Sequence, residues 1–144
     1  MKLTLVFLLA SFVLIPFTSF SQEIPLHVNT ITIKGVTRQQ IKKSLVQAGY
    51  RIPDRDSSTI VTLARTYEKL NWGSLILYVT MKDPQTAILT GAANLPPNGP
   101  MTDPYSKKFI PAENTSNHEN PWMAFQLMME FAKSLPGQVS YSKE

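Results

Sequence analysis

Residues 72–82, WGSLILYVTMK, decide the fold. Apolar side chains alternate with the others along this stretch, and such alternation is typical of a β-strand with two different faces. The face that should contact the core carries Leu75, Leu77, Val79 and Met81. The opposite face carries Tyr78 and Thr80, which can meet solvent or a partner. We expect this strand to lie in an antiparallel meander over residues 57–91.

A turn and a return strand should follow. Asp83 and Pro84 suit a type I turn, because proline fixes φ and the aspartate side chain can accept a hydrogen bond from the turn backbone. Residues 86–91 then favour a strand that Gly91 ends. The preceding residues 57–70 are interpreted as a strand because they contain many β-branched residues, although their apolar residues also recur at helical spacing.

A first helix is predicted for residues 37–48, after a strand within residues 27–36. Thr37 and Gln40 have the spacing of a capping box, in which each side chain bonds a backbone N–H group of the first turn. The expected buried stripe consists of Ile41, Leu45 and Ala48. Gly49 suits the left-handed conformation that commonly ends a helix.

Residues 92–120 are rich in proline and asparagine, so we expect a long loop with little regular structure. Asn120 and Pro121 suit the start of a second helix, which is apolar on most sides and should cover the apolar face of the meander. Pro136 ends this helix, and residues 138–144 are expected to form a tail. The sequence therefore predicts one α+β domain with an antiparallel β-sheet, the order β-α-β-β-β-α, and helices packed on one face.

Residues 1–21 have the pattern of a secretory signal peptide, in which Lys2 precedes an apolar run and small residues precede Gln22. A transmembrane anchor is the alternative, but the run is shorter than the roughly 20 residues that an anchor needs, and Pro16 interrupts it. We therefore expect residues 22–144 to form a single exported domain, periplasmic or extracellular, without a transmembrane segment. The chain has no cysteine, which excludes disulfide bonds, thiolate metal sites and a lipid-modified cysteine.

The charge balance is mildly basic. The chain has 14 Lys and Arg residues and 10 Asp and Glu residues, for a net charge of +4. The basic residues are scattered, and an exported protein leaves the compartment of the nucleic acids, so we do not expect nucleic-acid binding. Mild attraction to anionic envelope surfaces is the preferred interpretation.

The sequence contains none of the common catalytic motifs that we sought, namely a phosphate-binding glycine-rich loop, HExxH and GxSxG. His27 and His118 have no partner histidine at ligand spacing, and Asp54 and Asp56 lack the further oxygen ligands of a calcium loop. We predict that these four residues lie on the surface, and that the protein uses no metal or cofactor and is not an enzyme. The methionines of the second half are expected to fill the core.

Two candidate recognition surfaces remain. The first is a loop in which Tyr105 and Phe109 flank the basic pair Lys107 and Lys108, so that it can contact an anionic group or a polypeptide. The preferred alternative is a loop that the two aromatic residues merely anchor. The second surface is the outer face or free edge of the meander, where Tyr78 lies and where an extended partner can add a strand.

The order of elements resembles a family of small exported bacterial domains with a helix-grip or TBP-like fold, which includes outer-membrane assembly lipoproteins. The resemblance covers about residues 31–94 and rests on the helix at residues 37–48, the segment GYRIPDRDSSTIVT (49–62) and the strand AILTGAAN (87–94). It implies a sheet that grips a long helix and a role in binding or assembly, and it carries over no catalytic residue. The missing lipoprotein cysteine departs from the pattern.

A second resemblance competes with the first. VNTITIKGVTRQQIKKSL (28–45) followed by YEKLNWGSLILYVTMKD (67–83) is similar to a polypeptide-transport-associated (POTRA) domain, which would require a helix in residues 57–70.

From these observations we expect a non-catalytic binding or assembly module of the cell envelope, with an envelope or secreted protein as its partner. The alternative is a small secreted enzyme or ligand carrier, with a pocket between the C-terminal helix and the loop at residues 92–120.

Overall fold

The computed structural model of this chain describes residues 23–53, 58–70, 73–94, 109–117 and 120–143. Several predictions concern residues outside these ranges: the signal peptide, Asp54, Asp56, Tyr105, Lys107, Lys108 and His118.

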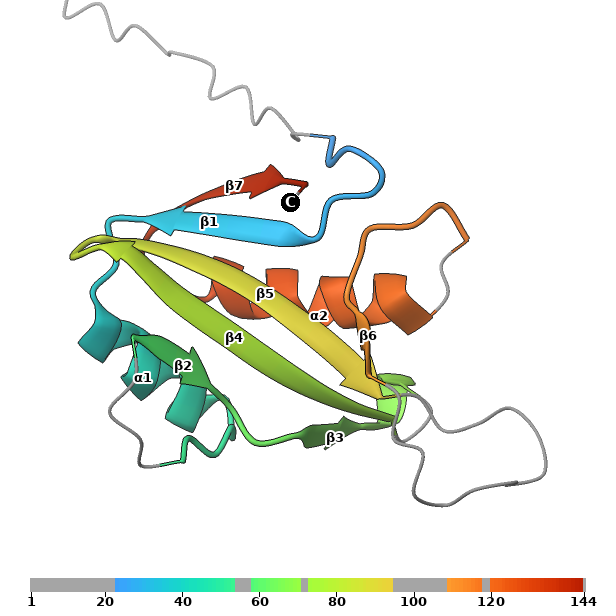
Figure 1. Ribbon diagram of the computed structural model, residues 1–144, viewed down its shortest axis with the longest axis horizontal. Helices are drawn as coiled ribbons and strands as arrows, with labels where there is room; N and C mark the ends of the chain where they lie inside the picture. The colour runs from blue at the N-terminus through green and yellow to red at the C-terminus, as the bar shows by residue number, and fades with distance from the viewer. Residues whose placement is uncertain (1–22, 54–57, 71–72, 95–108, 118–119, 144) are drawn as a thin grey trace, which may run out of the picture.

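The described residues form one antiparallel sheet of seven strands (Figure 1). The strands are β1 (Thr30–Lys34), β2 (Thr59–Val61), β3 (Arg65–Tyr67), β4 (Gly73–Asp83), β5 (Thr86–Asn94), β6 (Phe109–Pro111) and β7 (Gln138–Ser142). The main order is β2-β4-β5-β1-β7. The short strand β3 shares an edge of β4 with β2, and β6 shares an edge of β5 with β1. The predicted α+β class and antiparallel sheet are confirmed.

Strands β4 and β5 are the long central pair, and their side chains separate as the alternation predicts. On β4, Leu75, Leu77 and Val79 are buried, while Tyr78 is half-buried on the other face. The predicted turn is present, because the backbone N–H of Gln85 donates a hydrogen bond of 2.8 Å to Oδ1 of Asp83. Strand β5 continues past Gly91 to Asn94, so the predicted end of this strand was too early.

Helix α1 (Arg38–Gln47) confirms the first predicted helix. Thr37 is its N-cap, and both halves of the capping box form: the Thr37 side chain accepts from the Gln40 backbone, and Oε1 of Gln40 accepts from the Thr37 backbone at 2.8 Å. Ile41 and Leu45 are fully buried. Gly49 has a φ of +83°, the left-handed value that the sequence predicts after the helix.

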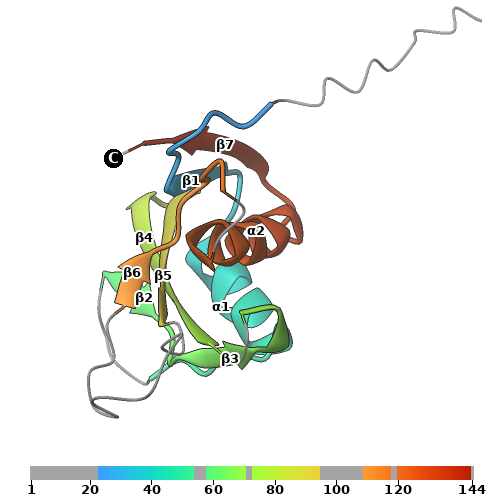
Figure 2. The ribbon, with the colours of Figure 1, turned by 90° about the vertical axis from the view of Figure 1, so that its right-hand side faces the viewer.

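Helix α2 (Asn120–Lys133) packs against β5 and β1, and both helices lie on the same side of the sheet (Figure 2). Its Phe125 and Met128 side chains are fully buried. The helix approaches the sheet closely at Gly91, where a Cβ atom would lie 2.6 Å from the sulfur of Met128. This arrangement confirms the prediction that helices cover one face, and the half-buried Met81, Met123 and Met129 also pack against the core.

Three parts of the expected order were wrong. Residues 57–70 do not form one strand, since β2 and β3 are separated by an irregular segment and followed by a short 3-10 helix, η1 (Glu68–Leu70). The loop at residues 92–120 contributes β6, and the expected tail is strand β7, which pairs with β1 along its full length. Both added strands gain backbone hydrogen bonds from partners distant in the sequence, which local signals do not reveal. The strands β2 and β3 also occupy the segment that a POTRA-like order requires to be helical.

Candidate functional site

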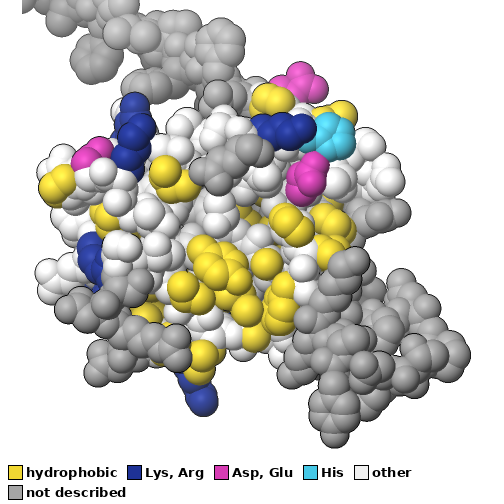
Figure 3. Space-filling view, in the orientation of Figure 1, with side chains coloured by type: hydrophobic (Ala, Val, Ile, Leu, Met, Phe, Trp, Pro, Cys, Tyr) yellow, Lys and Arg dark blue, Asp and Glu magenta, His cyan; other side chains and the backbone are white. Residues whose placement is uncertain are grey.

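The face of the sheet opposite the helices carries a connected group of apolar side chains (Figures 2 and 3). We call this group the open-face patch; it consists of Val61, Ile76, Tyr78, Ile88, Ala92, Phe109 and Pro111. The strand registers bring these residues together, because Val61 lies opposite Tyr78 and Ala92 lies opposite Pro111. No described helix covers this face of the sheet.

Hydroxyl groups surround the open-face patch. Thr59 and Thr80 lie opposite each other, and their Oγ1 atoms are 3.0 Å apart. Thr90 lies opposite Tyr78 on the neighbouring strand, and Thr32 lies opposite Ile88. The face therefore combines apolar contact area with side chains that can both donate and accept hydrogen bonds.

A hollow of about 420 Å³ opens on this face. Tyr78 and Phe109 line it together with Asn29, Thr30, Thr90 and Ala92. None of its described lining residues carries a charge, and α2 contributes no residue to it. A neutral, partly apolar group therefore fits this hollow better than an ion does.

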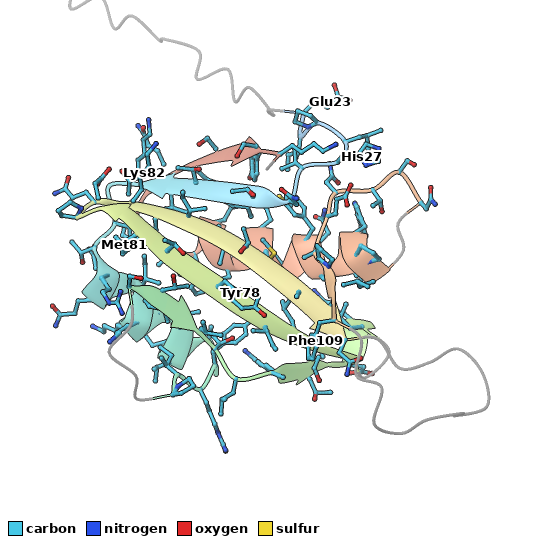
Figure 4. All side chains as sticks on the ribbon, in the orientation of Figure 1. Glu23, His27, Tyr78, Met81, Lys82 and Phe109 are labelled. Atoms are coloured by element: carbon cyan, nitrogen blue, oxygen red, sulfur yellow. The ribbon has the colours of Figure 1, made fainter. Side chains whose placement is uncertain are left out.

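The structure brings together two of the five predicted binding residues. Tyr78 on β4 and Phe109 on β6 lie on the same face and line the same hollow (Figure 4). The other three, Tyr105, Lys107 and Lys108, lie outside the described residues.

Sequence reasoning missed the remaining lining residues. Thr90 and Ala92 follow the same two-residue alternation as Ile88, so the period of β5 contained the signal that would have placed them on the outer face. The alternation of β1 likewise places Thr30 on the outer face, although this side chain is only 2% exposed.

The described groups with displaced pKa values lie elsewhere. Hydrogen bonds from the backbone of Gln85 and from Thr86 hold the pKa of Asp83 below its ordinary value. Burial raises the pKa of Tyr50 and, less strongly, that of Tyr141. Among the described residues, no group of three or more His, Cys, Asp and Glu side chains is placed to hold a metal ion.

The segment before β1, which the sequence presents as a plain lead into the fold, is fastened to the loop after β6. Nδ1 of His27 lies 2.6 Å from Oε1 of Glu113. The amide of Asn114 donates hydrogen bonds to the carbonyl oxygens of Ile24 and Pro25, at 3.1 and 2.8 Å. These contacts fasten the segment before β1, and His27 itself lies on the surface, as predicted.

Comparison with known proteins found no family model and no curated protein that matches this chain. In the part of the chain that the structure describes, no helix is both long and apolar enough to cross a membrane.

Proposed function

We propose that this chain is a non-catalytic binding module of the cell envelope, and that it holds an uncharged, partly apolar polypeptide segment against the open-face patch. The observation that carries the proposal is the position of this patch. It gathers seven apolar side chains on a face of the sheet that no described helix covers. A connected apolar surface on a folded domain commonly marks a site of protein interaction.

The chemistry of the face supports a polypeptide as the ligand. An extended chain presents apolar side chains together with backbone N–H and C=O groups. The face offers apolar side chains for the former and hydroxyl groups for the latter. Tyr78 and Phe109 supply aromatic contact area, and threonine hydroxyls such as those of Thr80 and Thr90 can bond backbone groups. Aromatic residues are enriched at protein interfaces because they bury a large area with few rotatable bonds.

The envelope location of this activity rests on the signal-peptide pattern of residues 1–21. An exported chain meets envelope and secreted proteins, so these are the partners that we propose.

A photo-crosslinking amino acid placed at Thr90 tests this function in intact cells. We expect adducts with one dominant envelope or secreted protein. The control position is Val46, which is 62% exposed on α1, away from the open-face patch. Equal adducts from both positions, or none from Thr90 in a folded and abundant protein, would contradict the proposal.

The second candidate function is that of a small-molecule carrier. The hollow lined by Tyr78 and Phe109 has a volume of about 420 Å³, which lies within the usual range for ligand pockets. A metabolite that raises the melting temperature, and fails to do so after Tyr78→Ala, would favour the carrier.

A further inference from the structure

A second hollow, of about 300 Å³, lies at the edge of the sheet where β3 runs. Gly49 and Arg51 line it from the segment that follows α1, and Arg65 and Thr66 line it from β3. Arg51 and Arg65 therefore line the same small space, and none of the described residues that line it is acidic.

Two tyrosine rings hold the guanidinium of Arg65 in place. Its central carbon lies 4.8 Å from the ring centre of Tyr67 and 5.4 Å from that of Tyr50. The rings are themselves connected, because the hydroxyl of Tyr67 donates a hydrogen bond of 2.5 Å to the hydroxyl of Tyr50. Tyr50 in turn contacts Phe131 of α2 edge-on, with ring centres 6.2 Å apart. The cation is thereby fixed against the end of the core.

Because Gly49 has no side chain, the guanidinium of Arg65 can lie close to the backbone at this position. A Cβ atom at position 49 would lie 3.2 Å from Nη1 of Arg65 and 3.3 Å from its Cζ. The positive φ of Gly49 also disfavours most other residues there. The close approach of backbone and cation thus depends on glycine.

The guanidinium groups of Arg51 and Arg65 have no anionic partner among the described residues. The described ion pairs are His27 with Glu113 and Lys69 with Glu130. A cation–π contact is not a hydrogen bond, so the N–H groups of the guanidinium remain able to donate hydrogen bonds. A positioned cation of this kind has its donors ready for an oxyanion.

We propose that this hollow binds a phosphate group between Arg51 and Arg65. Two guanidinium groups match the charge of a phosphate dianion, and the fork of N–H donors on each can engage two of its oxygen atoms. The phosphate can belong to a free anion or phosphate ester, or to the headgroup of an anionic phospholipid. This site is separate from the open-face patch, and it stands whether or not the proposed function is correct.

Isothermal titration calorimetry of the purified protein with inorganic phosphate at low ionic strength tests the site. Loss of one charge-assisted pair should weaken binding about tenfold, so we expect that effect from Arg51→Gln and at least as much from Arg65→Gln. The control is Lys82→Gln, which removes the same charge from β4 at a position that does not line the hollow (Figure 4). Its phosphate affinity should stay within about twofold of the parent value.

Arg51 is exposed, so Arg51→Gln should fold normally. This variant therefore tests the site even if Arg65→Gln destabilises the contacts between Arg65 and the two tyrosine rings. No heat of binding from folded parent protein, or equal weakening by Lys82→Gln, would overturn the proposal. Sedimentation with phosphatidylglycerol vesicles, compared with phosphatidylcholine vesicles, separates the two sources. If the protein binds the anionic vesicles and Arg51→Gln abolishes this binding, the ligand is a lipid headgroup. If the protein binds phosphate but not the vesicles, the ligand is a free anion or a phosphate ester.

Discussion

Tyr78 of β4 and Phe109 of β6 line the same hollow, although their strands lie on opposite sides of β5. The two aromatic residues thus frame the central strand from both sides, and the backbone and small side chains of β5 form the floor between them. This relationship gives the open-face patch its shape. The sheet thereby separates the proposed binding surface from the core, which lies on the other side of the same strands.

That separation predicts losses of stability of different size for two neighbouring residues. Leu77→Ala should lower the free energy of unfolding by about 2–5 kcal/mol, because Leu77 is fully buried in the core. Tyr78→Ala should lower it by about 1 kcal/mol or less, because Tyr78 lies on the uncovered face. Urea denaturation of the two variants measures both values. A larger loss for Tyr78→Ala than for Leu77→Ala would show that the face we call open is part of the core.

The junction between α2 and β7 should not tolerate a larger residue at Gly137. A Cβ atom there would lie 2.5 Å from the carbonyl oxygen of Lys34 and 2.7 Å from Cγ2 of Ile33. We expect Gly137→Ala to destabilise the protein by about 1–3 kcal/mol, since β7 must move away from β1.

The matched control for Gly137 is Gly35, which has a φ of +82° and where a Cβ atom would meet no other atom within 4 Å. Asparagine adopts this left-handed conformation more readily than most residues, so Gly35→Asn should lower stability by about 1 kcal/mol or less, which is a smaller loss than that of Gly137→Ala. Thermal unfolding of both variants provides the comparison. Equal stability changes would mean that steric contact at Gly137 is not the cause.

The cap of α1 should contribute measurably to stability. Thr37→Ala removes the acceptor for the Gln40 backbone N–H, and we expect a loss of about 1 kcal/mol. Thr37→Ser retains the hydroxyl and should lose much less. Chemical denaturation checks the pair, and identical losses for alanine and serine would exclude the capping hydrogen bond as the reason.

Stability should fall at alkaline pH because of Tyr50. Burial raises the pKa of the Tyr50 hydroxyl in the folded state above its ordinary value of about 10. Below pH 10 the group is protonated in both states, and its contribution is fully present. As the pH rises above about 10, only the unfolded chain releases the proton, so unfolding becomes easier by up to about 1.4 kcal/mol per pH unit.

Urea midpoints measured between about pH 8 and about pH 11 test this dependence. Tyr50→Phe should be less stable than the parent at neutral pH by about 1 kcal/mol, because it removes the hydrogen-bond partner of Tyr67. The same variant should show a shallower decline above pH 10. Parallel pH profiles for parent and variant would contradict the assignment to Tyr50.

The features that were predictable from the sequence are those that nearby residues determine. The capping box of Thr37 and Gln40 lies within one helical turn, and the alternation along β4 needs only its own residues. The turn at Asp83 is likewise local. In each case the residues that make the contact are also neighbours in the sequence, so their spacing carries the information.

The features that were not predicted depend on distant partners. Strand β6 has three residues, and it pairs with residues 92–94 of β5, from which a long connecting segment separates it in the sequence. Strand β7 alternates Val139 and Tyr141 with polar residues, which was a visible strand signal, but the preceding proline and glycine favoured a tail. The contact of Arg65 with Tyr50 was not predicted, because it joins β3 to the segment after α1 and leaves no local pattern in the sequence.

The candidate site divides in the same way. The alternation along β4 predicts the outward position of Tyr78. The sequence predicts Phe109 in a basic and aromatic loop, whereas the structure places it within β6. Its place beside the hollow is a consequence of the pairing between β5 and β6.

The most direct test of binding at the open-face patch is the yield of photo-crosslinked partner from Thr90, measured in cells with and without the double substitution Tyr78→Ser and Phe109→Ser. If the patch holds a polypeptide, the adduct formed by the parent protein should fall by about tenfold or more in the double variant while the amount of folded protein stays the same. An adduct that persists at the parent level in the folded double variant would contradict binding at this patch.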